Sequence, residues 1–207
     1  MLDEERAKGF GAGMITTSPR GASGKPVSRR WTFAEWRAEL PESNRSAELW
    51  DGKSVMSPSP SFYHQQIVDH FHDALKAWVR PQSLGKTCAS PIDMVLAERR
   101  AVQPDVLFVG RERLAIIGDV VNGAADLVAE VISPESRRRD RFDKRDLYEQ
   151  HGVREYWVLD PEASTVEVFY LEHGQYRLVG RWRPGEMAVS RLLAGFSVPV
   201  AGLFSAE

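Results

Sequence analysis

The sequence predicts a three-layer α/β/α domain built on a mixed β-sheet, and three observations lead to this fold class. Residues 106–109 and 127–132 are nearly continuous apolar runs, as strands covered on both faces are. Residues 61–79 carry an apolar stripe at helical spacing, which predicts a long amphipathic helix. The order of helix, hairpin, long helix, strands, helix and strands fits helices packed on a mixed sheet.

Length and composition are those of an ordinary globular protein. At 207 residues the chain suits a single domain, which we expect over residues 30–207. Residues 1–29 mix Gly, Ser, Pro, Lys and Arg with little periodicity, so we expect a flexible N-terminal arm there. The net charge of −2 gives no global basic field, so any contact with nucleic acid requires a local basic patch.

Cysteine content and hydropathy indicate in which cellular compartment the protein is expected. Cys88 is the only cysteine, which excludes an intrachain disulfide and a multi-cysteine zinc site. This usage favours a reducing, cytoplasmic location. No apolar stretch of the chain approaches the roughly 18 residues needed to span a bilayer, so we expect no membrane partner.

The N-terminal half of the domain contains a short helix, a hairpin and the long helix. Thr32 is expected to cap the short helix, with Glu35 three residues later completing a capping box. Residues 47–56 are expected to form a hairpin because Asp51-Gly52 is a strong two-residue turn signal. The long helix follows and ends before Pro81.

Most of the remaining elements are predicted strands. Residues 91–96 alternate weakly between apolar and polar, and residues 155–160 form a further apolar run. Residues 166–170 and 175–179 are expected to pair as a hairpin. We expect the tail from 189 to 204 to add an edge strand.

A second helix is predicted over residues 141–151, between two of the buried strands. Phe142, Leu147 and Tyr148 are expected to turn inward from it, and Gly152 is a good stop signal at its C-terminus. Asp140, Lys144 and Tyr148 recur at intervals of four and therefore share one face of this helix.

Two acidic residues stand where buried strands should have none. Asp105 opens the first apolar run, and Glu130 lies inside the second. Taken alone, Asp105 is adequately explained as a turn residue or cap at a strand start. Glu130 is harder to explain, because a lone glutamate in a central strand is rare unless it is paired. The alternative for Glu130 is a structural salt bridge to a nearby arginine.

Together the two acids predict a metal site. Strands that start near Asp105 and end near Glu130 could lie side by side, which would bring both carboxylates to one point. Oxygen ligands of this kind suit Mg²⁺ or Mn²⁺, and the backbone carbonyl of Val131 could supply another. Such a cation lowers the pKa of a water that it binds, which makes the water a usable nucleophile near neutral pH.

Lys144 is the third member of the predicted catalytic set. A lysine beside the cation can orient the water and help to stabilise charge that develops on a phosphoryl group. The alternative is an ordinary Asp140–Lys144 pair on a solvated surface, worth only a few tenths of a kcal/mol.

A basic segment follows the second acid and could bind phosphate. Residues 133–145 hold six basic and three acidic side chains. Arginine presents a planar fork that binds phosphate in a bidentate fashion. The predicted phosphate-binding residues are Arg137, Arg138, Arg139 and Arg141.

Glu48 and the histidines leave alternatives open. Glu48 precedes the predicted hairpin turn and is either a further catalytic carboxylate at the metal site or a plain hairpin residue. His64 and His72 lie eight residues apart and His70 points elsewhere, whereas a two-histidine zinc site on a helix requires a spacing of about four. We therefore reject a zinc site and expect His64 to be a surface residue rather than a phosphate contact.

These residues resemble a known family. From about Trp31 to Phe196, the chain is similar to the putative restriction endonuclease family of the PD-(D/E)XK nuclease superfamily. The resemblance is carried by several motifs in order: Glu48-Leu49-Trp50-Asp51-Gly52, Gln103-Pro104-Asp105-Val106, Glu130-Val131-Ile132-Ser133-Pro134, Asp140, Lys144, Tyr148, Gly152-Val153 and the run from Glu155 to Pro161.

The resemblance implies a restriction-endonuclease-like fold and Mg²⁺-dependent hydrolysis of phosphodiester bonds in DNA by a homodimer. Asp105 and Glu130 take the roles of the first and second acids of the motif. The superfamily pattern expects a lysine two residues after the second acid, but this chain has Ile132 there. The family instead places the lysine on the following helix, where Lys144 stands.

Three functions remain open at this stage. The first is a metal-dependent DNA endonuclease, and the second is a catalytically inactive nucleic-acid-binding or regulatory module on the same fold. The third is a structural protein whose acids merely pair with arginines. The choice between DNA and RNA, and the recognition sequence, do not follow from these residues.

Overall fold

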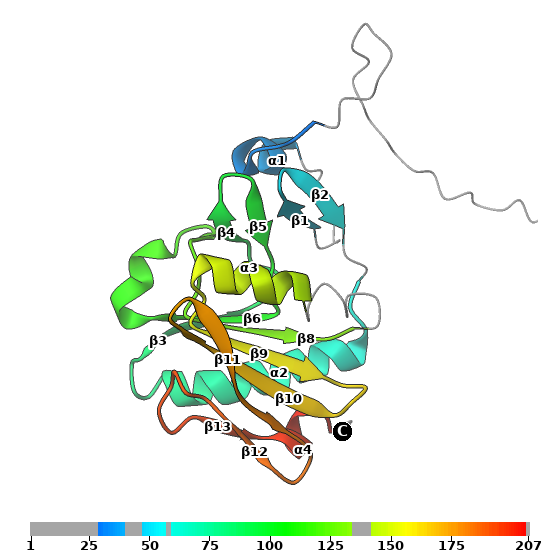
Figure 1. The fold of residues 1–207 in the computed structure, drawn as a ribbon, viewed down its shortest axis with the longest axis vertical. Helices are drawn as coiled ribbons and strands as arrows, with labels where there is room; N and C mark the ends of the chain where they lie inside the picture. Colours follow the sequence, from blue (N-terminus) through cyan, green and yellow to red (C-terminus); the bar gives the residue numbers. More distant parts are fainter. Residues whose placement is uncertain (1–28, 40–46, 57–58, 134–141, 206–207) are drawn as a thin grey trace, which may run out of the picture.

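The central element is a six-stranded mixed sheet (Figure 1). The computed structural model describes residues 29–39, 47–56, 59–133 and 142–205, so the predicted N-terminal arm lies almost wholly outside the described residues. The strand order is β11-β10-β9-β8-β6-β3, with β8 and β9 parallel and the other neighbours antiparallel. Its strands are β3 (Gly85–Ala89), β6 (Val106–Gly110), β8 (Leu127–Val131), β9 (Glu155–Asp160), β10 (Thr165–Glu172) and β11 (Gln175–Trp182).

A smaller five-stranded sheet, in the order β2-β1-β5-β4-β7, lies above the first in Figure 1. The predicted Asp51-Gly52 turn joins its first hairpin, and both residues have positive φ, as a type I′ turn requires. The short helix α1 (Phe33–Glu39) begins with the predicted capping box, in which the Glu35 carboxylate accepts from the Thr32 N–H at 2.9 Å. The strands are β1 (Ala47–Trp50), β2 (Lys53–Met56), β4 (Met94–Ala97), β5 (Arg100–Val102) and β7 (Val121–Asn122).

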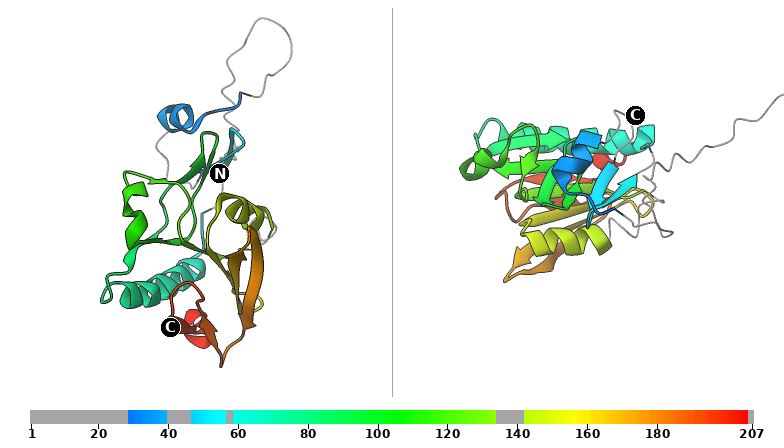
Figure 2. Two further views of the ribbon diagram at one scale, coloured as in Figure 1. Left: turned by 60° about the vertical axis from the view of Figure 1, so that its left-hand side comes forward. Right: turned by 90° about the horizontal axis from the view of Figure 1, so that it is seen from above.

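Helices cover the two faces of the main sheet, and the two views in Figure 2 separate these layers. Helix α2 (Phe62–Val79) buries Ile67, Phe71 and Leu75 against one face. Helix α3 (Lys144–His151) packs Leu147 and Tyr148 on the other face, beside residues of the smaller sheet. The α/β/α arrangement and the mixed sheet are therefore as the sequence predicts. A 3₁₀ helix, η1 (Arg111–Ile116), follows β6.

Several local predictions are wrong in detail. Phe142 does not turn inward, because its side chain is 54% exposed just before α3 begins. The strand predicted from residue 91 begins at Met94, after a cis peptide between Ser90 and Pro91. The tail does not extend the main sheet: β12 (Met187–Val189) and β13 (Ser197–Pro199) pair with each other, and helix α4 (Val200–Leu203) follows.

Glu155 attaches this C-terminal tail to the main sheet. It is fully buried at the start of β9, and its carboxylate accepts hydrogen bonds from the Trp157 indole N–H at 2.8 Å and from the Ser190 hydroxyl at 2.6 Å. It also accepts from the backbone N–H groups of Arg191 and Leu192, both at 2.7 Å. A buried carboxylate with four donors is well compensated, and its removal leaves those donors unsatisfied.

Replacing Glu155 with alanine is expected to lower the free energy of unfolding by about 3 kcal/mol or more, because hydrogen bonds to a charged group contribute roughly 1.5–3 kcal/mol each and are not additive. Urea denaturation followed by tryptophan fluorescence measures the loss. Glu39→Ala is the matched control, since Glu39 pairs with Arg29 on the surface and should cost little. Equal losses in the two variants would contradict this role for Glu155.

Among the described residues, no helix is long and apolar enough to cross a membrane.

Candidate active site

Four element ends meet at one edge of the main sheet. Because β6 and β8 are antiparallel, with Val106 opposite Ala129, the start of β6 lies beside the end of β8. The N-terminal ends of α2 and α3 lie at this same edge, at the right in Figure 1 and again in the right-hand view of Figure 2. The chain therefore brings together residues that are far apart in sequence.

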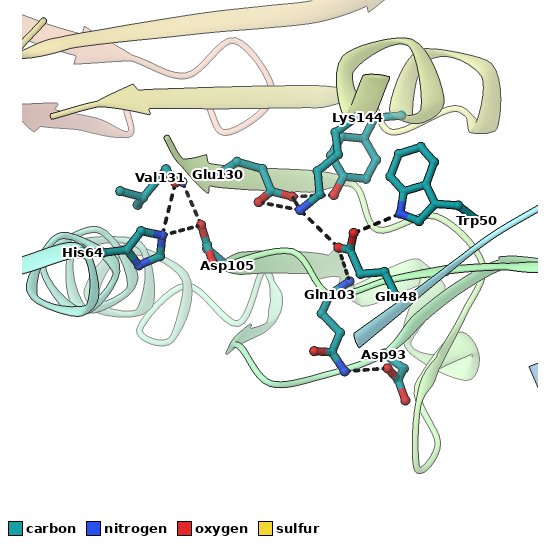
Figure 3. Close-up of polar contacts among 10 residues, drawn as sticks. Glu48, Trp50, His64, Asp93, Gln103, Asp105, Glu130, Val131 and Lys144 are labelled. Atoms are coloured by element: carbon teal, nitrogen blue, oxygen red, sulfur yellow. Dashed lines mark hydrogen bonds and ion pairs between the residues drawn. The ribbon is translucent and has the colours of Figure 1, made fainter. Parts of the chain in front are cut away.

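Glu130 faces α3 from β8. Side chains alternate along a strand, so Glu130 lies on the same face as Val128 and opposite to Ala129. It is 2% exposed, and its two carboxylate oxygens lie 2.9 and 3.0 Å from the Lys144 ammonium nitrogen. The hydroxyl of Tyr148 donates to the same carboxylate at 2.5 Å. Two groups one turn apart on α3 thus hold this acid, and Figure 3 shows the Lys144 contact.

Lys144 is buried between two acids from different sheets. Its ammonium nitrogen lies 3.2 Å from an oxygen of Glu48 on β1, besides its contacts with Glu130. The lysine is 5% exposed, so the alternative of a solvated surface pair is wrong for this residue. Asp140, the partner in that alternative, lies outside the described residues.

Glu48 is held on three sides. The backbone N–H of Gln103 donates to one oxygen at 3.1 Å, and the Trp50 indole donates to the other at 2.9 Å. The Gln103 side chain in turn donates to the buried Asp93 at 2.8 Å. Glu48 is therefore not a plain hairpin residue, because it is buried and bonded to Lys144.

Asp105 completes the group of acids. Its carboxylate accepts from the backbone N–H of Val131 at 2.8 Å and so extends the β6–β8 ladder by one hydrogen bond. Val131 follows Glu130 directly, which keeps Asp105 next to that carboxylate in Figure 3. The two acids predicted as metal ligands thus lie near one another at this sheet edge.

His64 is not a surface residue, contrary to expectation. Its Nε2 lies 3.1 Å from the carbonyl oxygen of Val131 and 3.4 Å from the carboxylate of Asp105. Burial lowers the pKa of the imidazole, but the hydrogen bond and charge of Asp105 outweigh this effect, so the pKa of His64 is raised. His70 and His72 lie elsewhere and contact the Leu203 carbonyl and the Thr87 hydroxyl.

The donor set fits a hard divalent cation with few protein ligands. In the described part of the chain, no three His, Cys, Asp or Glu side chains form a ready cage for a metal. Mg²⁺ does not need one, because it is usually bound by one or two carboxylates and keeps several waters. Asp105, Glu130 and the Val131 carbonyl provide two carboxylates and a carbonyl at one place.

Other predicted residues cannot be compared with this geometry because they lie beyond the part of the chain that the structure describes, and some partners of the site were not predicted. Arg137, Arg138, Arg139 and Arg141 all lie outside the described residues. Tyr148 turns inward as predicted, but its contact with Glu130 was not predicted, although its four-residue spacing from Lys144 was a usable signal. Gln103 carried no such signal, because it reaches Glu48 through the pairing of β1 with β5. Trp50 stands two residues after Glu48 on β1, so the alternation of side chains along a strand places both on one face.

Comparisons with known proteins identify the family to which this chain belongs. No match was found among curated proteins. A solved structure, that of a "putative nuclease belonging to DUF820" from Anabaena variabilis, aligns with a TM-score of 0.71 and 20% identity over 84% of this chain and 97% of that one. This likeness concerns the fold. A family model described as "Putative restriction endonuclease" matches residues 33–201. The chain therefore belongs to the Uma2 family of putative restriction endonucleases.

Proposed function

We propose that this protein is an Mg²⁺- or Mn²⁺-dependent endonuclease that hydrolyses phosphodiester bonds in duplex DNA. The observation that carries the proposal is the meeting of Asp105 and Glu130 at one sheet edge, with the Lys144 ammonium 2.9 Å from Glu130. Membership of the family supports a nuclease function in general. The dependence on a divalent metal and the choice of DNA as the substrate are proposals that go beyond this general function.

Charge supports cation binding at this edge. Among the described side chains of the cluster, Glu48, Asp105 and Glu130 are acidic and Lys144 is cationic. Even with His64 protonated beside Asp105, acids outnumber cations. Gathering carboxylates in a poorly solvated place costs free energy that a divalent cation would offset.

Each residue has a proposed task. Asp105, Glu130 and the Val131 carbonyl would hold the cation, which when bound lowers the pKa of an attacking water and stabilises charge on the phosphate. Lys144, kept beside Glu130 by Glu48, would orient that water. Hydrolysis adds the water oxygen to phosphorus and breaks one P–O ester bond, which leaves a phosphate monoester on one end and a hydroxyl on the other.

The substrate contacts extend the proposal beyond the described site. Arg137, Arg138, Arg139 and Arg141 would bind backbone phosphates, since they follow the proposed site residues Glu130 and Val131 in the sequence. We also propose a homodimer, in which each protomer cuts one strand of the duplex.

Cleavage of supercoiled plasmid tests the proposal. The purified protein is expected to nick or linearise the plasmid in millimolar Mg²⁺ or Mn²⁺ and to leave it intact in EDTA. A mobility shift of duplex DNA with no cleavage in either metal would instead favour a catalytically inactive binding module. Cleavage that continues in EDTA would contradict the metal-dependent mechanism.

A further inference from the structure

The hydroxyl of Tyr148 reaches Glu130 from helix α3. It stands one helical turn after Lys144 on α3, so both side chains lie on one face of the helix and reach the same carboxylate. The Tyr148 hydroxyl lies 2.5 Å from one oxygen of Glu130, within the range for a short, charge-assisted hydrogen bond. Tyr148 is therefore in contact with a proposed metal ligand without being one itself.

Packing fixes the direction of this hydroxyl. Tyr148 is fully buried, and its ring packs edge-on against Tyr156 with centroids 5.2 Å apart. Leu147, Val153 and Val158 belong to the same apolar cluster. A phenol held this tightly can turn little, so the O–H is directed at Glu130 before any ligand arrives.

The chemistry of the two groups suits this contact. A phenol donates its O–H, and a carboxylate oxygen accepts it. The hydrogen bond therefore holds the Glu130 carboxylate in one orientation, which is a condition that a cation ligand must meet.

We infer that Tyr148 is a positioning residue that sets the divalent-cation affinity of the site through its hydrogen bond to Glu130. The inference rests on the proposed function. Groups that hold a metal ligand in place typically account for a 10–100-fold change in metal affinity. The Tyr148→Phe variant is expected to bind Mn²⁺ about 10–100-fold more weakly, although every proposed ligand is still present.

The test compares Tyr148→Phe with Tyr176→Phe. Tyr176 is a partly buried tyrosine, and its hydroxyl donates to the Val153 carbonyl at 2.8 Å and not to an acid of the proposed site. Both variants lose one hydroxyl and one hydrogen bond, and calorimetry without metal is expected to show the larger loss in Tm for Tyr148→Phe, because its lost bond is to a charged carboxylate. Calorimetry also verifies that each variant is folded at the temperature of the binding measurement.

Mn²⁺ affinity, measured by electron paramagnetic resonance, separates positioning from mere packing. We expect the Mn²⁺ Kd to rise 10–100-fold in Tyr148→Phe and to stay at the wild-type value in Tyr176→Phe. The Mn²⁺ concentration that gives half-maximal cleavage should shift by the same factor. An unchanged Kd in Tyr148→Phe, or equal shifts in both variants, overturns the inference while leaving the nuclease proposal in place. A wild-type protein that binds no Mn²⁺ overturns both.

Discussion

Replacing Glu130 with glutamine is expected to abolish metal-dependent cleavage while leaving the fold intact. The amide is the same size as the acid and keeps one oxygen to accept from Lys144 or Tyr148, but it removes the charge that a divalent cation needs. Electrostatic stabilisation by a bound cation is worth several kcal/mol, and about 4 kcal/mol corresponds to roughly a 1000-fold loss in rate. Initial rates of plasmid nicking in Mg²⁺ measure the effect.

Asp105→Asn should give a loss of the same order, because both acids are proposed ligands of one cation. Glu39→Gln is the matched control, since Glu39 is an exposed acid on α1 whose partner is Arg29. Circular dichroism verifies that each variant is folded. Nicking at more than a tenth of the wild-type rate by either active-site variant would show that these carboxylates do not hold the catalytic cation.

Replacing Lys144 with methionine is expected to lower the free energy of unfolding by about 3–5 kcal/mol, in addition to abolishing cleavage. The change preserves the apolar length of the side chain but leaves Glu48 and Glu130, each 2% exposed, facing one another without their shared cation. Breaking a buried ion pair by removing one partner typically costs this much. Urea denaturation in EDTA measures the free energy of unfolding of the metal-free protein.

A second substitution tests the cause of that loss. Glu48→Gln in the Lys144→Met background removes one of the two facing charges and should recover part of the stability, which is the behaviour of coupled residues. Lys76→Met is the surface control: Lys76 lies 2.6 Å from the more exposed Asp73, and such pairs contribute at most about 1 kcal/mol. If Lys144→Met lowers the free energy of unfolding no more than Lys76→Met does, Lys144 does not stabilise the fold by neutralising Glu48 and Glu130.

The elements that the sequence predicts well are those set by local chemistry. The Asp51-Gly52 turn, the Thr32–Glu35 capping box and the stop at Gly152 each depend on a few neighbouring residues, and the structure has all three. The alternation within β8 also places Glu130 opposite to Ala129 whatever the rest of the fold does.

The less predictable features depend on contacts between distant segments. Strands β3 and β5 have no strong pattern of their own and form because β6 and β1 offer them paired edges. His64 looked like a surface residue because its helix position is polar, but the end of β8 covers it. Glu48 reaches Lys144 only because two separate sheets meet at α3, which no spacing in the sequence encodes.

A crystal soaked in Mn²⁺ is the decisive experiment for the proposed metal site, because anomalous scattering locates the cation without reference to activity. We expect one strong peak within bonding distance of the carboxylates of both Asp105 and Glu130, with the Lys144 ammonium group next to it. The absence of any peak at this sheet edge in a fully soaked crystal, or a peak bound only by other residues, would show that these two acids do not hold the cation.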